Sequence, residues 1–417
     1  MKRIVMCLLA FFLCLAGSAG AITLQEALKS GKVGGEIKYM YVDGSDTSVD
    51  AAKGIDDKTS QAAAIHLNYV SGDFYGFMAG ISFERSHDLT SDSDTPEPRL
   101  AFSESMMSQF YLQYNYQKSL IKVGRQYINT PLIKNNKGWA MYDSFDAAVL
   151  TLNAFPDTVI SAIYIKDWNT TWGNVPDVHY EDPVYSLYIQ NKSVKGLKLT
   201  GQYMTTSQKG NNGDIPSKTM DGYDTYFAQG DYKLPTAFPL TLSLQGGGAS
   251  FDKSSEDDTR FYGVKLATKV FNIQLETAFT SVDDDNDFPG TLGQVANAAM
   301  FNHMLINTSL FAGLDSLSFK AGYDFADLGV KGLRTSLMYT TFSQSDAGMS
   351  HSARNMDDSY EVDLDVRYAF SGYLKGLGLR VWAGYASYDL GVPADVNDND
   401  GNDDDVTYVR CFVDYKF

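Results

Sequence analysis

Residues 406–417 read VTYVRCFVDYKF, and this closing stretch decides the fold. On a strand with period two, one face holds Val409, Cys411, Val413, Tyr415 and Phe417, and the other holds Tyr408, Arg410, Asp414 and Lys416. A soluble core does not explain a charged face on a strand that ends the chain. In a transmembrane β-barrel the apolar face meets lipid and the polar face lines the lumen, so the alternation predicts a closing barrel strand.

The amino-terminal 21 residues have the three parts of a secretory signal peptide. Lys2 and Arg3 precede an apolar run over residues 4–16, and small residues follow at 19–21. A transmembrane helix is the alternative, but the apolar run is too short to span a bilayer. We therefore expect residues 1–21 to be removed and residues 22–417 to form a single outer-membrane β-barrel domain.

The composition of the remaining chain excludes several classes of protein. Cys411 would be its one cysteine, so no internal disulfide can form. No further apolar run reaches the roughly 18 residues of a membrane-spanning helix. The net charge of the full chain is −17, which makes nucleic acid an improbable partner.

Alternating segments recur from residue 32 to the carboxyl end and predict an all-β, antiparallel barrel of about 18 strands. The expected strands are 32–42, 60–71, 73–86, 106–117, 119–128, 144–154, 157–168, 184–193, 195–206, 222–233, 239–250, 260–270, 271–280, 317–327, 332–343, 359–369, 376–388 and 405–417. An even number fits single-chain bacterial barrels. The boundary near Val270 is the least marked, since it has neither Gly nor Pro.

The connections between these strands are alternately short and long. The long ones are 43–59, 87–105, 129–143, 169–183, 207–221, 251–259, 281–316, 344–358 and 389–404, and they are rich in Asp, Ser, Asn and Gly. Short periplasmic turns and long extracellular loops are typical of outer-membrane barrels. A soluble β-sandwich, the alternative, would not sort its loops in this way.

The strand phases predict which charged residues line the pore. The expected basic row is Lys38, Lys122, Lys198, Lys265, Lys269, Lys320, Arg334, Arg367, Arg380 and Arg410. The expected pore-lining carboxylates are Glu36, Glu276, Asp324, Glu361, Asp363, Asp365 and Asp414. A basic residue facing lipid at mid-depth costs about 2–4 kcal/mol, so the alternation is an energetic requirement.

Arg125 does not fit this row, because Ile121 and Val123 put its phase on the lipid face. We expect it at the outer rim, where its guanidinium reaches the interface. A one-residue bulge would instead turn it into the pore, where it would join the basic side chains of the constriction.

Three stretches carry a resemblance to a known family. VGRQYINTP at 123–131, GYDFADLGVKGLRTSLMY at 322–339 and LQEAL at 24–28 resemble OprD-type outer-membrane porins. The resemblance implies an eighteen-stranded barrel whose pore is narrowed by the third loop, here 129–143, and the seventh loop, here 281–316. It also implies a row of basic side chains that guides anionic groups.

The third loop departs from the family pattern. An Asp-x-Arg element usually follows Thr-Pro, whereas this chain has Lys134, two asparagines and Lys137. Basic charge is kept, but the bidentate fork of arginine is lost. With Arg125, these lysines are the residues that we assign to the constriction.

The seventh loop contains a possible short helix. Its apolar face would hold Leu292, Val295, Ala296, Ala299 and His303. We expect this segment to fold into the pore, with a cap over the mouth as the alternative.

The sequence gives no sign of an enzyme, a cofactor or a metal centre. The histidines, His66, His87, His179, His303 and His351, are scattered, and no Gly-x-Ser-x-Gly element is present. The acidic run at 395–405 fails the EF-hand spacing. Loose divalent binding by this loop is left open.

The function expected from these observations is passive diffusion of small polar solutes across the outer membrane. The mixed charge of the wall suits anionic or zwitterionic carboxylates and amino acids. The alternative is a structural or adhesive barrel with a plugged lumen. Expected partners are outer-membrane lipid, lipopolysaccharide and the β-barrel assembly machinery, which would read the strand that ends in Phe417; a homo-oligomer is left open.

Overall fold

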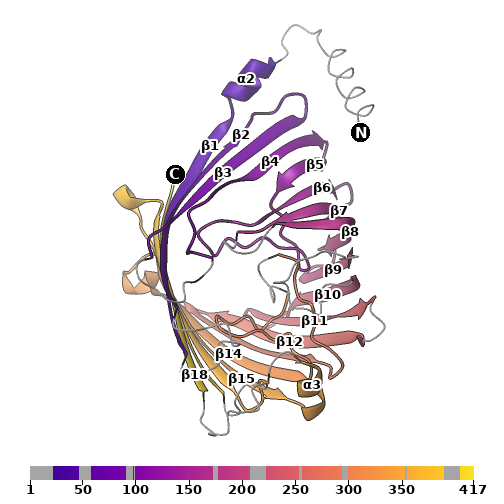
Figure 1. Cartoon of the computed structure of the whole chain (residues 1–417), viewed down its shortest axis with the longest axis vertical. Coiled ribbons are helices and arrows are strands. Elements are labelled where there is room, and N and C mark those ends of the chain that lie inside the picture. Colours follow the sequence, from indigo (N-terminus) through magenta and orange to yellow (C-terminus); the bar gives the residue numbers. More distant parts are fainter. Residues whose placement is uncertain are drawn as a thin grey trace.

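The computed structural model describes residues 22–46, 58–90, 97, 99–171, 177–206, 222–252, 256–293, 299–352, 355–388 and 404–417. Eighteen antiparallel strands form one closed barrel (Figure 1). The strands are β1 (Lys32–Asp46), β2 (Lys58–Val70), β3 (Phe77–Asp88), β4 (Ser105–Tyr116), β5 (Ser119–Gln126), β6 (Ser144–Leu152), β7 (Thr158–Asn169), β8 (Val178–Asn191), β9 (Leu197–Thr206), β10 (Tyr223–Lys233), β11 (Leu240–Phe251), β12 (Thr259–Val270), β13 (Ile273–Val282), β14 (Leu314–Asp324), β15 (Leu333–Gln344), β16 (Tyr360–Ala369), β17 (Leu377–Tyr388) and β18 (Asp404–Lys416). The predicted fold class and strand number are confirmed.

Each strand pairs with its neighbours in the chain, and β1 pairs with β18 to close the barrel. The seam is in register from Glu36 opposite Lys416 to Asp46 opposite Val406. At its end the amide of Phe417 donates to the carbonyl of Gly35 at 3.1 Å, and the amide of Gly35 donates to the carbonyl of Phe417 at 3.0 Å. The closing stretch therefore uses its last residue as a strand residue.

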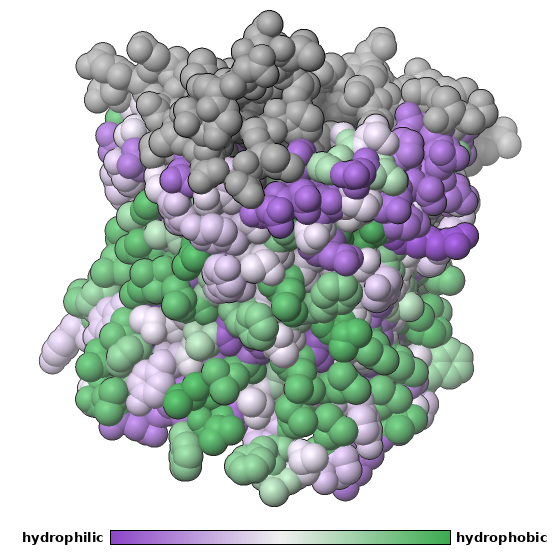
Figure 2. All heavy atoms as spheres, turned by 90° about the horizontal axis from the view of Figure 1, so that it is seen from below, coloured by the Kyte–Doolittle hydropathy of each residue, from purple (hydrophilic) through white to green (hydrophobic). Residues whose placement is uncertain are grey.

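The two faces of the closing strand differ as the alternation predicts. Val413, Tyr415 and Phe417 are exposed on the outer face, whereas Tyr408 and Phe412 are buried inside. Figure 2 shows the wider result on one side of the barrel: hydrophobic side chains cover most of the wall, and hydrophilic ones gather near the end that carries the long loops. An apolar outer surface of this kind is what a bilayer requires of a barrel wall.

The apolar core lies inside the barrel, between the wall and the inserted loops. One cluster joins residues of the third and seventh loops, such as Ile133 and Leu292, to wall residues such as Phe227. A second cluster surrounds Trp139 of the third loop. A barrel of eighteen strands is wide enough for an aqueous lumen, so these loops reduce a space that the wall leaves open.

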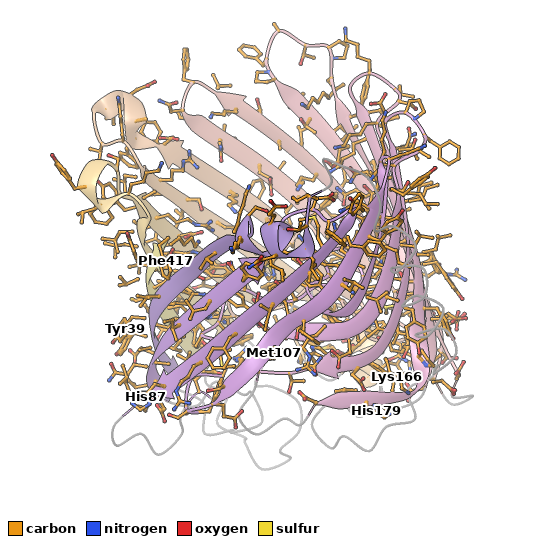
Figure 3. The ribbon with its side chains drawn as sticks, turned by 90° about the horizontal axis from the view of Figure 1, so that it is seen from above. Tyr39, His87, Met107, Lys166, His179 and Phe417 are labelled. Carbon is orange, nitrogen blue, oxygen red and sulfur yellow. The ribbon has the colours of Figure 1, made fainter. Side chains whose placement is uncertain are left out.

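The short turns and the long loops lie at opposite ends. Helix α2 (Leu24–Lys29) packs at the short-turn end, where the amide of Gly72 donates to the carbonyl of Ala27 at 2.8 Å. Figure 3 shows Phe417 nearer this end, and His87 and His179 at the rim that carries the long loops. The turn after Val270 consists of two residues, with Phe271 at φ 54°.

Strand β8 begins six residues before its predicted start. Asp167 pairs with His179, and Ile165 pairs with Val184, so the register shifts between these pairs. Pro183 lies in the interrupted part of β8 and has no N–H to donate. The sequence interpretation therefore began the strand only after Pro183, at residue 184.

Two predictions fall outside the described residues. These are the signal peptide at 1–21 and most of the acidic run at 395–405. Within the described residues no helix is both long enough and apolar enough to cross a membrane.

The seam between Gly35 and Phe417 generates a test of barrel closure. A Cβ at position 35 would lie 2.5 Å from the ring of Phe417 and 2.7 Å from the carbonyl oxygen of His66. We expect Gly35→Ala to destabilise the folded barrel by about 1–3 kcal/mol, the usual cost of overpacking. Urea unfolding in lipid vesicles, followed by tryptophan fluorescence, measures the loss.

Gly230→Ala is the matched control. Its Cβ would meet only Leu199, at 3.5 Å, which is an ordinary contact. Equal stability of the two variants would show that the close approach at the seam is not a constraint on closure.

Candidate solute channel and its constriction

The third loop (residues 127–143) is fixed at one end to strands β1 and β3. The ammonium of Lys38 donates to the carbonyl of Trp139 at 3.0 Å and to the hydroxyl of Tyr142 at 3.1 Å. The amide of Tyr142 donates to the carboxylate of Glu84 at 2.8 Å, and its hydroxyl donates to Glu36. Wall side chains therefore satisfy the polar groups that the loop brings into the barrel.

Trp139 anchors the same part of the loop through its ring. The guanidinium of Arg99, from the second long loop, lies 3.8 Å from the ring centroid, and that of Arg410 on β18 lies 4.2 Å from it. Trp139 is 1% exposed, so these cation–π contacts are desolvated, which strengthens them. Arg99 is also held by Glu97, with Nε 2.5 Å from the carboxylate.

The other end of the third loop reaches the opposite part of the wall and the seventh loop (residues 283–313). The amide of Leu132 donates to the side chain of Gln202 on β9 at 2.9 Å. The amide of Lys134 donates to the carbonyl of Leu292, and the amide of Leu292 donates to the carbonyl of Leu132, both at 2.9 Å. The two loops thus join inside the barrel and cross its lumen as one structure (Figure 1).

The seventh loop is held by carboxylates of β16. The amides of Leu305, Ile306 and Asn307 donate to Glu361 at 2.8–3.0 Å, and the amide of Leu305 also donates to Asp363 at 2.9 Å. Glu361 is 1% exposed. One buried carboxylate therefore supplies the acceptors for three successive backbone amides.

These anchors correct several predictions for the pore wall. Glu36, Glu361, Asp363 and Lys38 do face inward, but each is buried beneath a loop rather than exposed along the pore. The other predicted carboxylates are paired with bases: Glu276 with Lys265, Asp324 with Arg334, Asp365 with Arg367 and Arg380, and Asp414 with Lys416. The strand phases correctly placed these side chains on the inner face of the wall. They did not reveal that loop backbone or basic side chains bind them.

Beside the joined loops is a cavity of about 540 Å³ whose charged lining is mainly basic. Its cations are Lys134, Lys137, Lys320, Arg367 and Arg380. Asp363 and Asp365 also line it, and both are engaged as described above. Tyr127 and Trp382 add aromatic surface.

A second cavity, of about 560 Å³, continues from the first. The two share Lys320, Ser336, Asp365 and Arg367 in their lining. The second cavity adds Lys269 and Arg334, which lie near the short-turn ends of their strands. Basic side chains thus follow the open space from the constriction toward the short-turn end.

The remaining members of the predicted basic row lie elsewhere. Arg410 is covered by the third loop, Lys122 stacks on Tyr111, Lys198 pairs with Asp231 at 2.7 Å, and Lys265 stacks on Phe301. The structure therefore brings together Lys269, Lys320, Arg334, Arg367 and Arg380 of that row, with Lys134 and Lys137 of the constriction.

Arg125 lies on the outer face, as its strand phase predicts, so its assignment to the constriction is wrong. It lies on β5 opposite Phe110, which is exposed on the outer face, and it pairs with Asp146 at 2.9 and 3.1 Å. Asp146 on β6 lies directly opposite Arg125 and in phase with the exposed Leu150, so period two alone places this pair on the outer face. Gly124 has a φ of 118°, and a Cβ at this position would lie 2.3 Å from the carbonyl oxygen of Phe110. Glycine has no Cβ and therefore allows β5 to come this close to β4.

His303 is a site residue whose place the sequence did not reveal. It lines the first cavity, and its ring lies 6.3 Å from that of Trp382. Burial, together with the charges of Lys134 and Arg410, lowers the pKa of His303 to about 4. Burial also lowers the pKa of Lys134.

The predicted helix of the seventh loop is absent from the described residues. Leu292 forms a bridge with Ile133, while Val295 and Ala296 lie outside the described ranges. In the described part of the chain, no group of three or more His, Cys, Asp or Glu side chains is arranged to hold a metal ion.

Comparisons with known proteins agree with this geometry. A family model described as outer membrane porin, OprD family, matches residues 78–417. Among solved structures, OpdK of Pseudomonas aeruginosa with vanillate is 16% identical, with a TM-score of 0.74 over 94% of this chain and 99% of that one. OccK2 (OpdF) of the same organism in complex with glucuronate is 14% identical, with a TM-score of 0.75 over 94% and 98%. No curated protein matches.

Removing the anchor of the seventh loop tests its role in narrowing the lumen. Glu361→Ala leaves three backbone amides without their acceptor, and each donor left unsatisfied costs about 1–3 kcal/mol. We expect the loop to leave the wall and the single-channel conductance in planar bilayers to rise. Asp231→Asn is the control, since Asp231 pairs with Lys198 on the wall, holds no loop and lines neither cavity. Equal conductance in the two variants would contradict the anchor.

The depressed pKa of His303 predicts a pH dependence. The imidazole is neutral near pH 7 and gains a proton only as the pH falls through about 4, which adds positive charge to the cavity. We expect wild type and His303→Asn to have equal anion-to-cation permeability at about pH 6. At about pH 3.5 the wild type should be the more anion-selective; divergence already near the ordinary histidine pKa would contradict this environment.

Proposed function

The chain belongs to the OprD family of outer-membrane porins, and from this premise we propose that it admits small anionic carboxylates by passive diffusion. The observation that carries the proposal is the unequal state of the two kinds of charge in the lumen. The carboxylates hold loops or pair with arginines and lysines. In contrast, Lys134, Lys137, Lys269 and Lys320 line the continuous open space, and no carboxylate of the described residues lies within ion-pair distance of them.

A solute carboxylate would meet its partners in sequence. Lys134 and Lys137 lie at the constriction, Lys320 and Arg380 lie beside it, and further cations follow in the second cavity. Each replaces part of the hydration of an anion, and the spread over several sites keeps any one site from holding the solute too tightly. The ammonium of Lys320 lines both cavities and suits transfer between them.

The same arrangement favours plain anions over zwitterions. An amino acid also needs an acceptor for its ammonium group, and the wall carboxylates are already engaged. The ligands of the two related structures, vanillate and glucuronate, are carboxylates, which supports this solute class. The continuous cavities argue against the alternative of a plugged, adhesive barrel.

The ion selectivity of the purified protein tests this proposal. In a potassium chloride gradient across a planar bilayer, the reversal potential should indicate preference for the anion. Lys320→Gln and Arg380→Gln should each reduce that preference, because each removes one charge from the path. Lys198→Gln is the matched control, since Lys198 is paired with Asp231 away from both cavities.

Solute competition refines the test. Benzoate should reduce the chloride current, whereas benzamide, its uncharged match, should not. A cation-selective channel would show that the basic side chains do not set selectivity. Absence of discrete conductance would favour the plugged barrel.

A further inference from the structure

Two neighbouring short turns differ from the rest of the rim. The turn between β14 and β15 contains the 3₁₀ helix η3 (Phe325–Leu328), followed by Val330 and Lys331. The turn between β16 and β17 contains η4 (Gly372–Leu374), followed by Lys375. Since β15 pairs with β16, the turns are adjacent, about 10 Å apart along the rim at the usual strand spacing.

Both turns project outward from the barrel wall. Figures 1 and 3 show two short orange and yellow helices side by side that extend away from the barrel. The backbone of each is fixed: Asp324 caps η3 through the amide of Ala326 at 3.1 Å, and the amide of Lys375 donates to the carbonyl of Gly372 at 3.2 Å. The side chains they carry are therefore presented outward by a defined backbone.

These side chains are apolar at the tips, with two lysines beside them and one exposed carboxylate, Asp327, in η3. Leu328 is 65% exposed, Leu374 is 52% exposed and Tyr373 is fully exposed. Lys331 and Lys375 are also exposed, and in the described part of the chain neither ammonium is paired with a carboxylate. Water is a poor environment for such exposed apolar side chains, so this pair of turns is suited to contact with an apolar partner.

The position of the turns identifies those surroundings. In an outer-membrane barrel the short turns lie at the periplasmic side, next to the phospholipid leaflet, and the long acidic loops lie outside. Aromatic residues settle at the level of lipid headgroups, and lysine stems extend along apolar surface while the ammonium reaches a phosphate. Lysines near such a surface attract anionic lipids.

We propose that the turns bearing η3 and η4 bind the headgroup of an anionic phospholipid, of the phosphatidylglycerol class, in the inner leaflet of the outer membrane. Lys331 and Lys375 flank the phosphate, and Tyr373, Leu374 and Leu328 enter the boundary between headgroups and acyl chains. This inference depends on the membrane location of the barrel and not on which solute its lumen admits.

Other short turns in the described part of the chain lack a 3₁₀ helix. The adjacent turns between β8 and β9 and between β10 and β11 do carry lysines, Lys192, Lys195 and Lys233, beside the exposed Val194 and Phe238.

The turn between β6 and β7 exposes Phe155 next to Asp157 and carries no lysine. The turn between β12 and β13 consists of Phe271 and Asn272, again without a lysine. Exposed apolar side chains alone would suit a lipid with any headgroup. The two lysines on adjacent turns therefore provide the preference for a negatively charged headgroup.

Native mass spectrometry of the intact barrel tests the proposal. The protein is released from nanodiscs that hold equal amounts of phosphatidylglycerol and phosphatidylcholine, and the retained lipids are weighed. We expect the wild type to retain phosphatidylglycerol preferentially, and the double variant Lys331→Gln, Lys375→Gln to lose about tenfold or more of that enrichment. Heat-modifiable electrophoretic mobility and conductance verify that the variant is folded and open.

The matched control is Lys118→Gln, Lys192→Gln. It removes the same number of positive charges, but from two turns that are not adjacent. The β6–β7 turn, which has no lysine, lies between them. Retention of the preference in this control, with loss in the first variant, supports a local site. Equal losses in both variants would reduce the effect to general surface charge, and an unchanged preference in the first variant, or none in the wild type, would overturn the site.

Discussion

The lumen depends on one kind of interaction: wall carboxylates that accept hydrogen bonds from loop backbone. A loop inside a barrel leaves its amides without the partners that a strand or water would provide. Glu361 and Asp363 provide these partners for the seventh loop, and Glu84 provides one for the third. The two oxygens of a carboxyl side chain can each accept more than one hydrogen bond, so one side chain replaces several backbone partners.

This use of carboxylates also sets the electrostatics of the pore. A count of charges on the inner wall describes a mixed lumen, but a buried carboxylate that accepts several hydrogen bonds is not available to a passing cation. Asp365 is engaged in another way, by Arg367 and Arg380. The net charge of −17 is therefore no guide to the inside of the barrel, because acidic residues are concentrated in the outer loops while basic ones line the open cavities.

The sequence was sufficient for properties that repeat along a strand. Lipid on one side and a polar lumen on the other impose period two, so all eighteen strands, and the inward phase of Glu361 or Lys320, could be predicted. Interruptions of the ladder limited this: Pro183 hid the start of β8, where the register between β7 and β8 shifts. The path of the loops could not be predicted either, since the bridge between Ile133 and Leu292 joins segments about 160 residues apart with no shared period.

The closing stretch has a second consequence for the lumen. Glu36 and Lys38 lie on β1, and Arg410 lies on β18, so the strands of the seam also carry anchors of the third loop. Lys38 reaches the Trp139 carbonyl while Arg410 covers the ring of the same residue. These contacts come from two strands at opposite ends of the chain, which meet only when the barrel closes. The third loop therefore acquires its complete set of anchors only at closure, and the residues that complete the wall also help to narrow the pore.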